Sequence, residues 1–451
     1  MTPMTCPLVE RLQTIADPRR QNENLKHPLV DLIVLGFCGV LAGGADFVEI
    51  AKWGRVHEPF LRTFLELPHG IPSHDTLTRV FAALKPAALQ EVLVPWLLEK
   101  RGEVGEWIHV DGKTLRGTRC QQRKLKALHV VSAWAGQSGL TLGQVAVTEK
   151  SNEITAIPEL LKLLDLHEKI VTIDAMGCQK TIATAIVEGG GDYVLAVKDN
   201  QPTLHAELQD AFVQAPTPKP RSSRVATTVT HGHGRVERRT VRVLPAQEAL
   251  SAAQWALWLG VLSVVMVTRE VWDKATEGYR TETSYYLSSL PPLARRIGAA
   301  IRGHWSIENG LHWVLDVVFR EDARRVYERT TAENVAFLNR LALSVFRGDP
   351  SKDSLKVKRK QAGWSTSYLA QLLGLPPLEA RLPWIPHPVR PEPGGDSERP
   401  RPVALLVGTW GHHLRLRPVR PPVIAHLGQE TKVEFVGEHQ GHARLELRKS
   451  V

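Results

Sequence analysis

Three acidic residues lie where they could hold metal ions. Asp111 ends the apolar stretch WIHVD, and Asp174 ends the apolar stretch KIVTID. Ligands collect at the carboxyl ends of strands in an α/β sheet, so these two carboxylates would converge if the strands are neighbours. Glu308 lies farther along, in RGHWSIENGLHWVLDVVF. Ligation by oxygen alone suits Mg²⁺ or Mn²⁺, and two such ions about 3.5–4 Å apart would suit phosphodiester chemistry.

Taken singly, an Asp at a strand end is usually a turn former or a helix cap, so the position of Glu308 is the sharper signal. At about 100° per residue, Glu308 shares one narrow helix face with an apolar stripe. The members of that stripe are Ile297, Ile301, His304, Leu311 and Leu315. A buried, unpaired carboxylate is strongly disfavoured, and a shared metal ion would supply the cation it needs. Asp316, Glu321 and Asp322 are rival acids, and Asp316 lies about 80° further round the helix.

The same helix carries His304 and His312, four residues before and after Glu308. Closely spaced histidines on a helix bind zinc in some hydrolases, but the HExxH signature is absent, so zinc is the weaker interpretation. With Trp305 and Trp313, these histidines also form an aromatic cluster that could stack on splayed bases. Trp305 could equally anchor the helix to the sheet.

Apolar patterns predict the elements that must position these side chains. Residues 1–100 are predicted to be helical, with one helix over 29–41 and others after a cap at Asp46, from Pro59 through Leu67, and after a cap at Ser73. Three or four short helices are compatible with a helix-turn-helix-like DNA reader. The favoured interpretation is a small bundle used for packing or dimerisation.

After residue 105 the pattern changes to strands and alternating helices. Expected strands cover 107–111, 128–135, 140–147, 169–174 and 193–197, and expected helices cover 154–166, 180–188 and 202–212. Three strands followed by helix and strand in alternation is the order of the ribonuclease-H-like fold, which predicts an α/β catalytic domain. A β-rich stretch follows at about 216–290, and a long helical period covers 293–319.

Composition narrows the classes of protein further. The 451 residues allow two to four domains, and 43% hydrophobic with 23% charged residues is ordinary for a globular protein. A net charge of +10 favours polyanionic partners, with nucleic acid ahead of acidic membranes. Four cysteines without a CxxC pair fit a reducing cytosol, and no apolar run has the features of a signal peptide or a membrane span. Walker A, GxGxxG and GxSxG patterns are absent, which disfavours nucleoside-triphosphate and serine-hydrolase chemistry.

Several strings, in order, resemble the bacterial insertion-sequence transposases of the DDE type, in the branch that includes the H-repeat-associated proteins. They include LKHPLVDLIVLGFCGVLAG, IPSHDTLTRVF, HVDGKTLRGT, TIDAMGCQK, YVLAVKDNQPTL and RGHWSIENGLHWVLDVVFRED, and the match runs from about residue 9 to about 375. The resemblance implies a catalytic, metal-binding triad of Asp111, Asp174 and Glu308 with two Mg²⁺ (or Mn²⁺) ions. It also implies a ribonuclease-H-like domain with a β-rich insertion.

The resemblance further implies DNA as the partner, both the terminal inverted repeats of a mobile element and the target DNA. Cleavage at the element ends would be followed by joining of the 3′-OH to the target. A homodimer is expected on DNA because two ends are joined, with a cytoplasmic, nucleoid-associated location and no membrane partner. A DNA-binding remnant that no longer moves, and a nuclease that cuts without joining, are the alternatives.

Four regions are expected along the chain. A helical N-terminal domain, which could bind DNA, covers 1–100, and the catalytic domain covers 101–347 with its insertion at about 216–290. A basic segment covers 348–375. The tail over 376–451 is expected to be poorly ordered because 12 of the 30 prolines lie between Pro376 and Pro422, although strand-like text (VEFV, ARLEL) follows them.

Basic and polar residues near the acids are candidate contacts to DNA. They are Lys113, Arg116, Lys198, Gln201, Arg302, His304, Asn309 and His312. The related insertion-sequence pattern has Tyr, Arg, Glu and Lys on the Glu helix, where this chain has Ile301, His304, Glu308 and Leu315. The Tyr, Arg and Lys roles therefore do not carry over, and formation of a DNA hairpin stays open.

Overall fold

The computed structural model describes residues 5–20, 25–147, 152–216, 219, 222–232, 235–273, 278–377, 433–439 and 442–447. The chain divides into two compact units, Met1–Pro383 and Trp384–Val451. In the second unit the described residues form β10 (Val433–His439) and β11 (His442–Leu447), which pair antiparallel where the sequence has strand-like text. The rest of the predicted Pro-rich tail beyond residue 377 lies outside the described residues.

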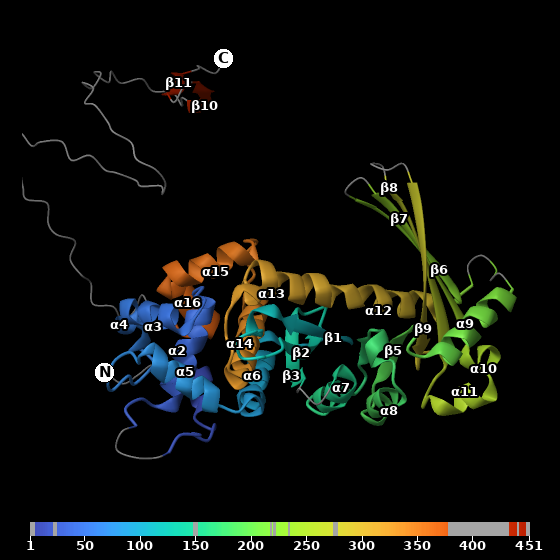
Figure 1. Cartoon of the computed structure of the whole chain (residues 1–451), viewed down its shortest axis with the longest axis horizontal. Helices are drawn as coiled ribbons and strands as arrows, with labels where there is room; N and C mark the ends of the chain where they lie inside the picture. The colour runs from blue at the N-terminus through green and yellow to red at the C-terminus, as the bar shows by residue number, and fades with distance from the viewer. Residues whose placement is uncertain are drawn as a thin grey trace, which may run out of the picture. The chain divides into compact units, whose positions relative to one another are not determined.

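A nine-stranded mixed sheet forms the centre of the first unit, in the order β3-β2-β1-β4-β5-β9-β8-β7-β6 (Figure 1). Its first five strands are β1 (Trp107–Leu115), β2 (Leu128–Ala135), β3 (Leu140–Val147), β4 (Ile170–Ile173) and β5 (Asp192–Val197). β1 pairs antiparallel with β2 and parallel with β4, and β4 pairs parallel with β5. The expectation that β1 ends at Asp111 is wrong, because its pairing with β2 continues to Leu115.

The β-rich stretch extends this same sheet. Its strands are β6 (Val225–Gly232), β7 (Arg235–Pro245), β8 (Ser263–Asp273) and β9 (Gly278–Ser288), which we call the arm. β9 pairs antiparallel with β5 and so attaches the arm to the central strands. In Figure 1 the far ends of β7 and β8 project beyond the helices. The sequence did not predict the short helices α10 (Ala246–Ala249) and α11 (Ala252–Leu257) within it.

Helices cover both faces of the sheet (Figure 1). On one face, α7 (Glu153–Leu161) packs against β2 and β3, and α8 (Lys180–Glu188) packs against β5. The next helix in the chain after β5 is α9 (Pro202–Gln214). α12 (Ala294–Ile307) crosses β1 and β4 on the other face. The helical period predicted over 293–319 is present, but a π turn (Glu308–His312) separates α12 from α13 (Trp313–Val317).

The N-terminal region is helical, as predicted. Its helices are α1 (Pro7–Leu12), α2 (Leu29–Leu41), α3 (Phe47–Val56), α4 (Glu58–Leu61), α5 (His74–Ala83) and α6 (Pro86–Arg101). The caps at Asp46 and Ser73 are confirmed, since their side chains accept the backbone N–H groups of Glu49 and Thr76. No described helix is both long and apolar enough to cross a membrane by itself; α5 and α6 reach that length and apolarity only together, across a 95° bend.

The helix expected from Pro59 through Leu67 is wrong, because α4 ends at Leu61. Leu67 has a left-handed backbone with a φ of 43°. The carboxylate of buried Asp31 accepts the N–H groups of Leu67, at 2.8 Å, and of Glu66, at 3.4 Å. These bonds hold a turn where the apolar spacing alone predicts a helix.

The buried helix α14 (Arg329–Gly348) joins the N-terminal helices to the sheet. It packs on α2, α5 and α6 on one side and on β2 and β3 on the other, so one hydrophobic core runs through both regions. The amide of Asn334, fully buried, donates to the carbonyls of Phe81 and Leu84 at 2.8 Å each. These contacts give the N-terminal helices a packing role. α15 (Leu355–Trp364) and α16 (Thr366–Leu373) complete the unit.

We expect Asn334→Leu to lower the free energy of unfolding by about 2–4 kcal/mol, because two buried carbonyls lose their donor. Urea unfolding followed by circular dichroism measures the change. Thr78→Ala, on the exposed side of α5, is the control and should stay within about 0.5 kcal/mol of the wild type. An equal loss in both variants would contradict this role for Asn334.

Candidate active site

Adjacent parallel strands bring Asp111 and Asp174 side by side. Val110 on β1 is paired with Ile173 on β4, and each of the two acids is the next residue along its strand. Neighbouring strands lie about 4.8 Å apart, so the two carboxylates leave the sheet close together. Both line a cavity of about 530 Å³, and Glu308 lines it too. The three acids therefore line one cavity, but Asp174 does not belong to the group of ligand atoms that Asp111 and Glu308 form with a third residue.

Asp174 combines a structural and an electrostatic role. Its carboxylate accepts the N–H groups of Met176 and Gly177 at 3.1 and 3.4 Å, so it also caps the short turn that follows β4. Burial, and after it the negative charge of Glu153, raises the pKa of Asp174, while the backbone donors and Lys198 act in the opposite direction. The helix-cap interpretation is thus correct for this residue without removing it from the cavity.

Glu308 lies at the solvent side of the cavity. The apolar residues of its predicted stripe, Ile297, Ile301, Leu311 and Leu315, are buried as expected. The Glu308 side chain itself is 53% exposed, so the expectation of a buried carboxylate is wrong. The physical reason is that Glu308 lines the open cavity, so this part of the stripe faces solvent and not the core.

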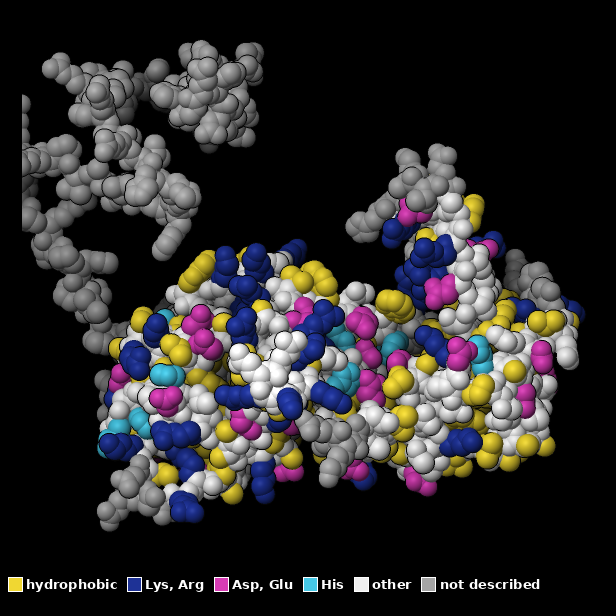
Figure 2. Space-filling view, viewed as in Figure 1, with side chains coloured by type: hydrophobic (Ala, Val, Ile, Leu, Met, Phe, Trp, Pro, Cys, Tyr) yellow, Lys and Arg dark blue, Asp and Glu magenta, His cyan; other side chains and the backbone are white. Residues whose placement is uncertain are grey.

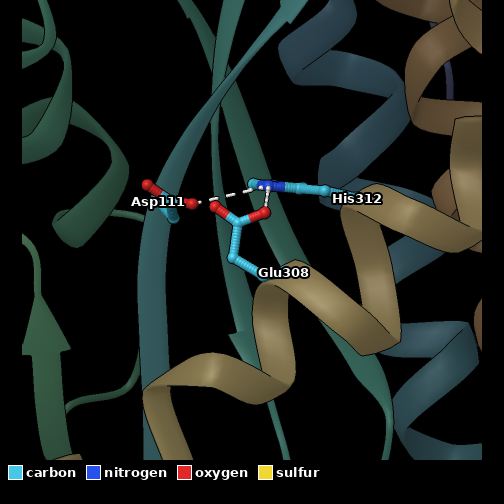
Figure 3. A group of neighbouring side chains, drawn as sticks. All are labelled: Asp111, Glu308 and His312. Atoms are coloured by element: carbon cyan, nitrogen blue, oxygen red, sulfur yellow. Dashed lines mark ion pairs between the residues drawn. The ribbon is translucent and has the colours of Figure 1, made fainter. Parts of the chain in front are cut away.

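A third side chain, His312, faces Asp111 and Glu308 from the end of the π turn (Figure 3). Its Nδ1 lies 3.4 Å from Asp111 Oδ2 and 3.6 Å from Glu308 Oε2. One ligand atom from each of these three residues lies within 4.8 Å of the other two. They form a group that could hold a metal ion, with two carboxylates and one imidazole.

The electrostatics of this group call for a cation. Burial and the neighbouring charge of Glu308 raise the pKa of Asp111 to about 8, with a smaller contribution from Asp174. Burial lowers the pKa of His312 to about 3, so the imidazole is neutral near pH 7 and supplies no positive charge. Clustered carboxylates with no compensating charge are unfavourable. A divalent ion fits both the charge and the donor set.

The rival acids are already paired with cations. Asp316 binds Lys113 at 2.7 Å, and Asp322 lies 3.9 Å from the same ammonium. Glu321 is buried and binds Arg340 at 3.1 Å. Of the acids around the helix, Glu308 is therefore the one that turns toward the cavity.

His304 is held away from this group. Its Nδ1 is 2.8 Å from Thr172 Oγ1, and the same hydroxyl lies 2.7 Å from Nδ1 of His109. Burial lowers the pKa of His304 to about 4. The two histidines of the expected zinc ladder therefore do not converge on one ion. Trp305 is 59% exposed, so it does not anchor the helix to the sheet.

The candidate DNA contacts differ in accessibility. Lys198 is exposed at the cavity, and Arg302, Asn309 and Arg116 are exposed as well. Lys113 is 8% exposed and committed to Asp316, which leaves it no free face toward a phosphate. The Gln201 amide donates to the carbonyl of Cys178 at 2.9 Å.

Sequence reasoning missed Arg239 and Arg269, which line the cavity from the arm. Both contact Glu237, at 2.9 and 2.8 Å. β7 carries four Arg residues, so charge alone does not single out Arg239, and Arg269 is an isolated Arg on β8. Only the pairing of β9 with β5 brings the arm beside the acids.

Comparison with known proteins assigns the family. Residues 105–345 match the family described as "Transposase DDE domain", and residues 9–97 match the one described as "DDE_Tnp_1-associated". This chain belongs to the bacterial insertion-sequence transposases of the DDE type. The transposase family implies use of divalent metal, and the group of Asp111, Glu308 and His312 is a place where this chain could bind one.

The match to two relatives of this transposase covers nearly the whole length of each relative. "Putative transposase YncI" of Escherichia coli O157:H7 is 36% identical over 369 residues, which are 81% of this chain and 94% of the relative. "H repeat-associated putative transposase YhhI" of E. coli K12 is 35% identical over 370 residues, or 81% and 97%. Among solved structures, a piggyBac transposase synaptic complex with hairpin DNA matches 83% of this chain and 79% of that chain, with a TM-score of 0.37 and 11% identity, too low a likeness to support an argument.

The raised pKa of Asp111 predicts a pH dependence for the metal-free transposase. The carboxyl stays protonated in the folded protein up to about pH 8 but ionises near pH 4 in the unfolded chain. Stability contributed by this group is therefore complete below about pH 4 and is lost as the pH rises to about 8. Asp111→Asn should remove that loss and raise the free energy of unfolding at pH 8 by about 2–5 kcal/mol.

Urea unfolding at pH 5, 6.5 and 8 with a chelator measures this effect. Asp199→Asn is the matched control, because Asp199 also lines the cavity but its side chain is fully exposed. The control should follow the wild type at each pH. Identical pH profiles for wild type and Asp111→Asn would show that Asp111 is not the titrating group.

Proposed function

We propose that this transposase cuts DNA at the ends of its element and joins the freed 3′-OH to target DNA, with Asp111, Asp174 and Glu308 holding two Mg²⁺ or Mn²⁺ ions. The observation that carries the proposal is the meeting of these three acids at one cavity, from β1, β4 and the end of α12. The order of β1 to β5, three antiparallel strands followed by two parallel ones, supports a ribonuclease-H-like catalytic domain.

The three acids differ in how they are held and in their position in the cavity. Divalent ions held here would lower the pKa of an attacking water and offset charge at the scissile phosphate. Asp111 and Asp174 are fixed by the sheet, and Asp174 is also fixed by its two backbone donors. Glu308 approaches from the solvent side, where a DNA strand would enter the cavity.

Basic side chains around the cavity support DNA as the substrate. Lys198, Arg239 and Arg269 line it, and Arg302 is exposed on the helix that carries Glu308. Figure 2 shows Lys and Arg side chains gathered on the visible face of the arm. Cations in these places would neutralise backbone phosphates on either side of the cut. Because two element ends must be joined, we propose that two copies act together on DNA.

We expect Asp111→Asn, Asp174→Asn and Glu308→Gln each to reduce cleavage by about a hundredfold or more, since each removes a ligand worth several kcal/mol in the transition state. Binding of the element ends should remain. Cleavage and joining are measured with labelled end DNA, a target plasmid and Mg²⁺ or Mn²⁺.

Asp316→Asn is the control for the third acid. Full activity in Glu308→Gln together with loss in Asp316→Asn would transfer the role to Asp316. Cleavage without any joined product, from pre-cut ends as well, would make the protein a nuclease and contradict the strand-transfer step.

Lys198→Ala and Arg302→Ala should each weaken binding of end DNA about three- to tenfold near 0.1 M salt. Each should also lower the slope of log K against log salt by about one, because one phosphate contact is lost. Fluorescence anisotropy over a salt series measures both. Lys162→Ala, an exposed charge outside the cavity, is the control and should change neither quantity.

A further inference from the structure

The His312 imidazole has no part in the proposed triad, yet it faces two of the three acids. It is buried, and its Nδ1 lies 3.4 Å from Asp111 Oδ2 and 3.6 Å from Glu308 Oε2 (Figure 3). A buried histidine beside carboxylates can be a hydrogen-bond donor that positions them or a ligand of an ion that they share.

The backbone is arranged around this contact. The π turn spans Glu308 to His312, with the N–H of Trp313 bonded to the carbonyl of Glu308. A π turn contains one residue more than an α turn, is less favourable than the α-helix around it, and occurs often at functional sites. Here it begins and ends at the two side chains that point toward Asp111. The helix thus departs from α geometry between these two residues, which also share one side of the helix by their spacing of four.

The donor atoms are spaced for one small ion. Ligands about 2.1 Å from a divalent ion and at right angles to each other lie about 3 Å apart. The separations from His312 Nδ1 to the two carboxylates are only about half an ångström wider than this, and the described group brings all three atoms within 4.8 Å. A slight contraction around an ion would complete the geometry.

We propose that His312 is a metal ligand in this transposase, binding through Nδ1 the same ion as Asp111 and Glu308. The site then has one nitrogen donor besides its carboxylates, which favours Mn²⁺ over Mg²⁺, because imidazole suits transition metals and Mg²⁺ prefers oxygen. This inference rests on the proposed metal-dependent function and adds a residue and an ion preference to it.

The chain offers a matched control in His304. It lies on the same helix and is half-buried. Its Nδ1 is taken by Thr172, and it does not belong to the group of three ligand atoms. His129 is a second control near the acids, since its Nε2 is bound to Glu153.

The test uses the full-length protein with Mn²⁺ alone. Pulsed electron paramagnetic resonance should detect coupling of Mn²⁺ to an imidazole ¹⁴N in the wild type, changing frequency on labelling with ¹⁵N-histidine. The coupling should be lost in His312→Asn and His312→Gln and kept in His304→Asn and His129→Asn. Mn²⁺ affinity should fall about tenfold or more in the His312 variants. The ratio of Mg²⁺ to Mn²⁺ dissociation constants should fall by a similar factor.

Each alternative result decides whether His312 is a metal ligand or whether the proposed function itself fails. A wild type that binds Mn²⁺ through Asp111 without imidazole coupling overturns the ligand role and leaves the proposed function intact. Rescue of Mn²⁺ affinity by His312→Asn, whose amide can replace the Nδ1–H donor, would make His312 a positioning residue instead. No Mn²⁺ binding by folded wild type would end the proposed function as well. If neither His312 variant folds, coupling that persists in both control variants still supports His312, and its absence from the wild type still overturns it.

Discussion

Burial of the Asp111 carboxyl beside Glu308 is the constraint to which much of the surrounding structure answers. Asp174 directly follows the strand paired with β1 and adds a smaller effect on Asp111, and burial removes the water that would screen these groups. Two backbone N–H groups offset part of the charge on Asp174. A backbone N–H, that of Gly112, offsets part of the charge on Asp111, but burial and the charge of Glu308 outweigh it. The sheet is packed through α14 into one core with the N-terminal helices, which holds these residues in place.

Several acidic residues near the site are already paired with a basic residue. Lys113 and Arg340 neutralise the acids that follow the helix, Asp316 and Glu321. The negative charge left over is concentrated at the cavity, on the side chains best placed to hold ions. Lys113, which the sequence suggested as a DNA contact, thus contributes to the site by neutralising Asp316.

Local chemistry explains how much the sequence could predict. Caps at Asp46 and Ser73, and the apolar runs of α2, β2, β3 and α8, depend on residues within a few positions, and the structure has them at the expected bounds. Features that depend on distant partners were missed. The end of α4 is set by Asp31, some thirty residues away in sequence. The arm joins β5 through strand pairing across the domain, and this pairing sets the positions of Arg239 and Arg269. The exposure of Glu308 depends on the cavity that it lines together with residues of the arm, which the period along one helix does not describe.

Acidic and basic side chains line the same cavity, and under the proposed function this has a consequence for the order of binding. Without ions, a DNA phosphate entering the cavity would meet the carboxylates of Asp111, Asp174 and Glu308, and the repulsion would be strong in a partly buried site. Lys198 is exposed at the cavity, whereas Arg239 and Arg269 are paired with Glu237, so Lys198 is better placed to attract a phosphate. Divalent ions bound by the acids would replace this repulsion by attraction. Ions would therefore have to bind before a phosphate could reach the acids.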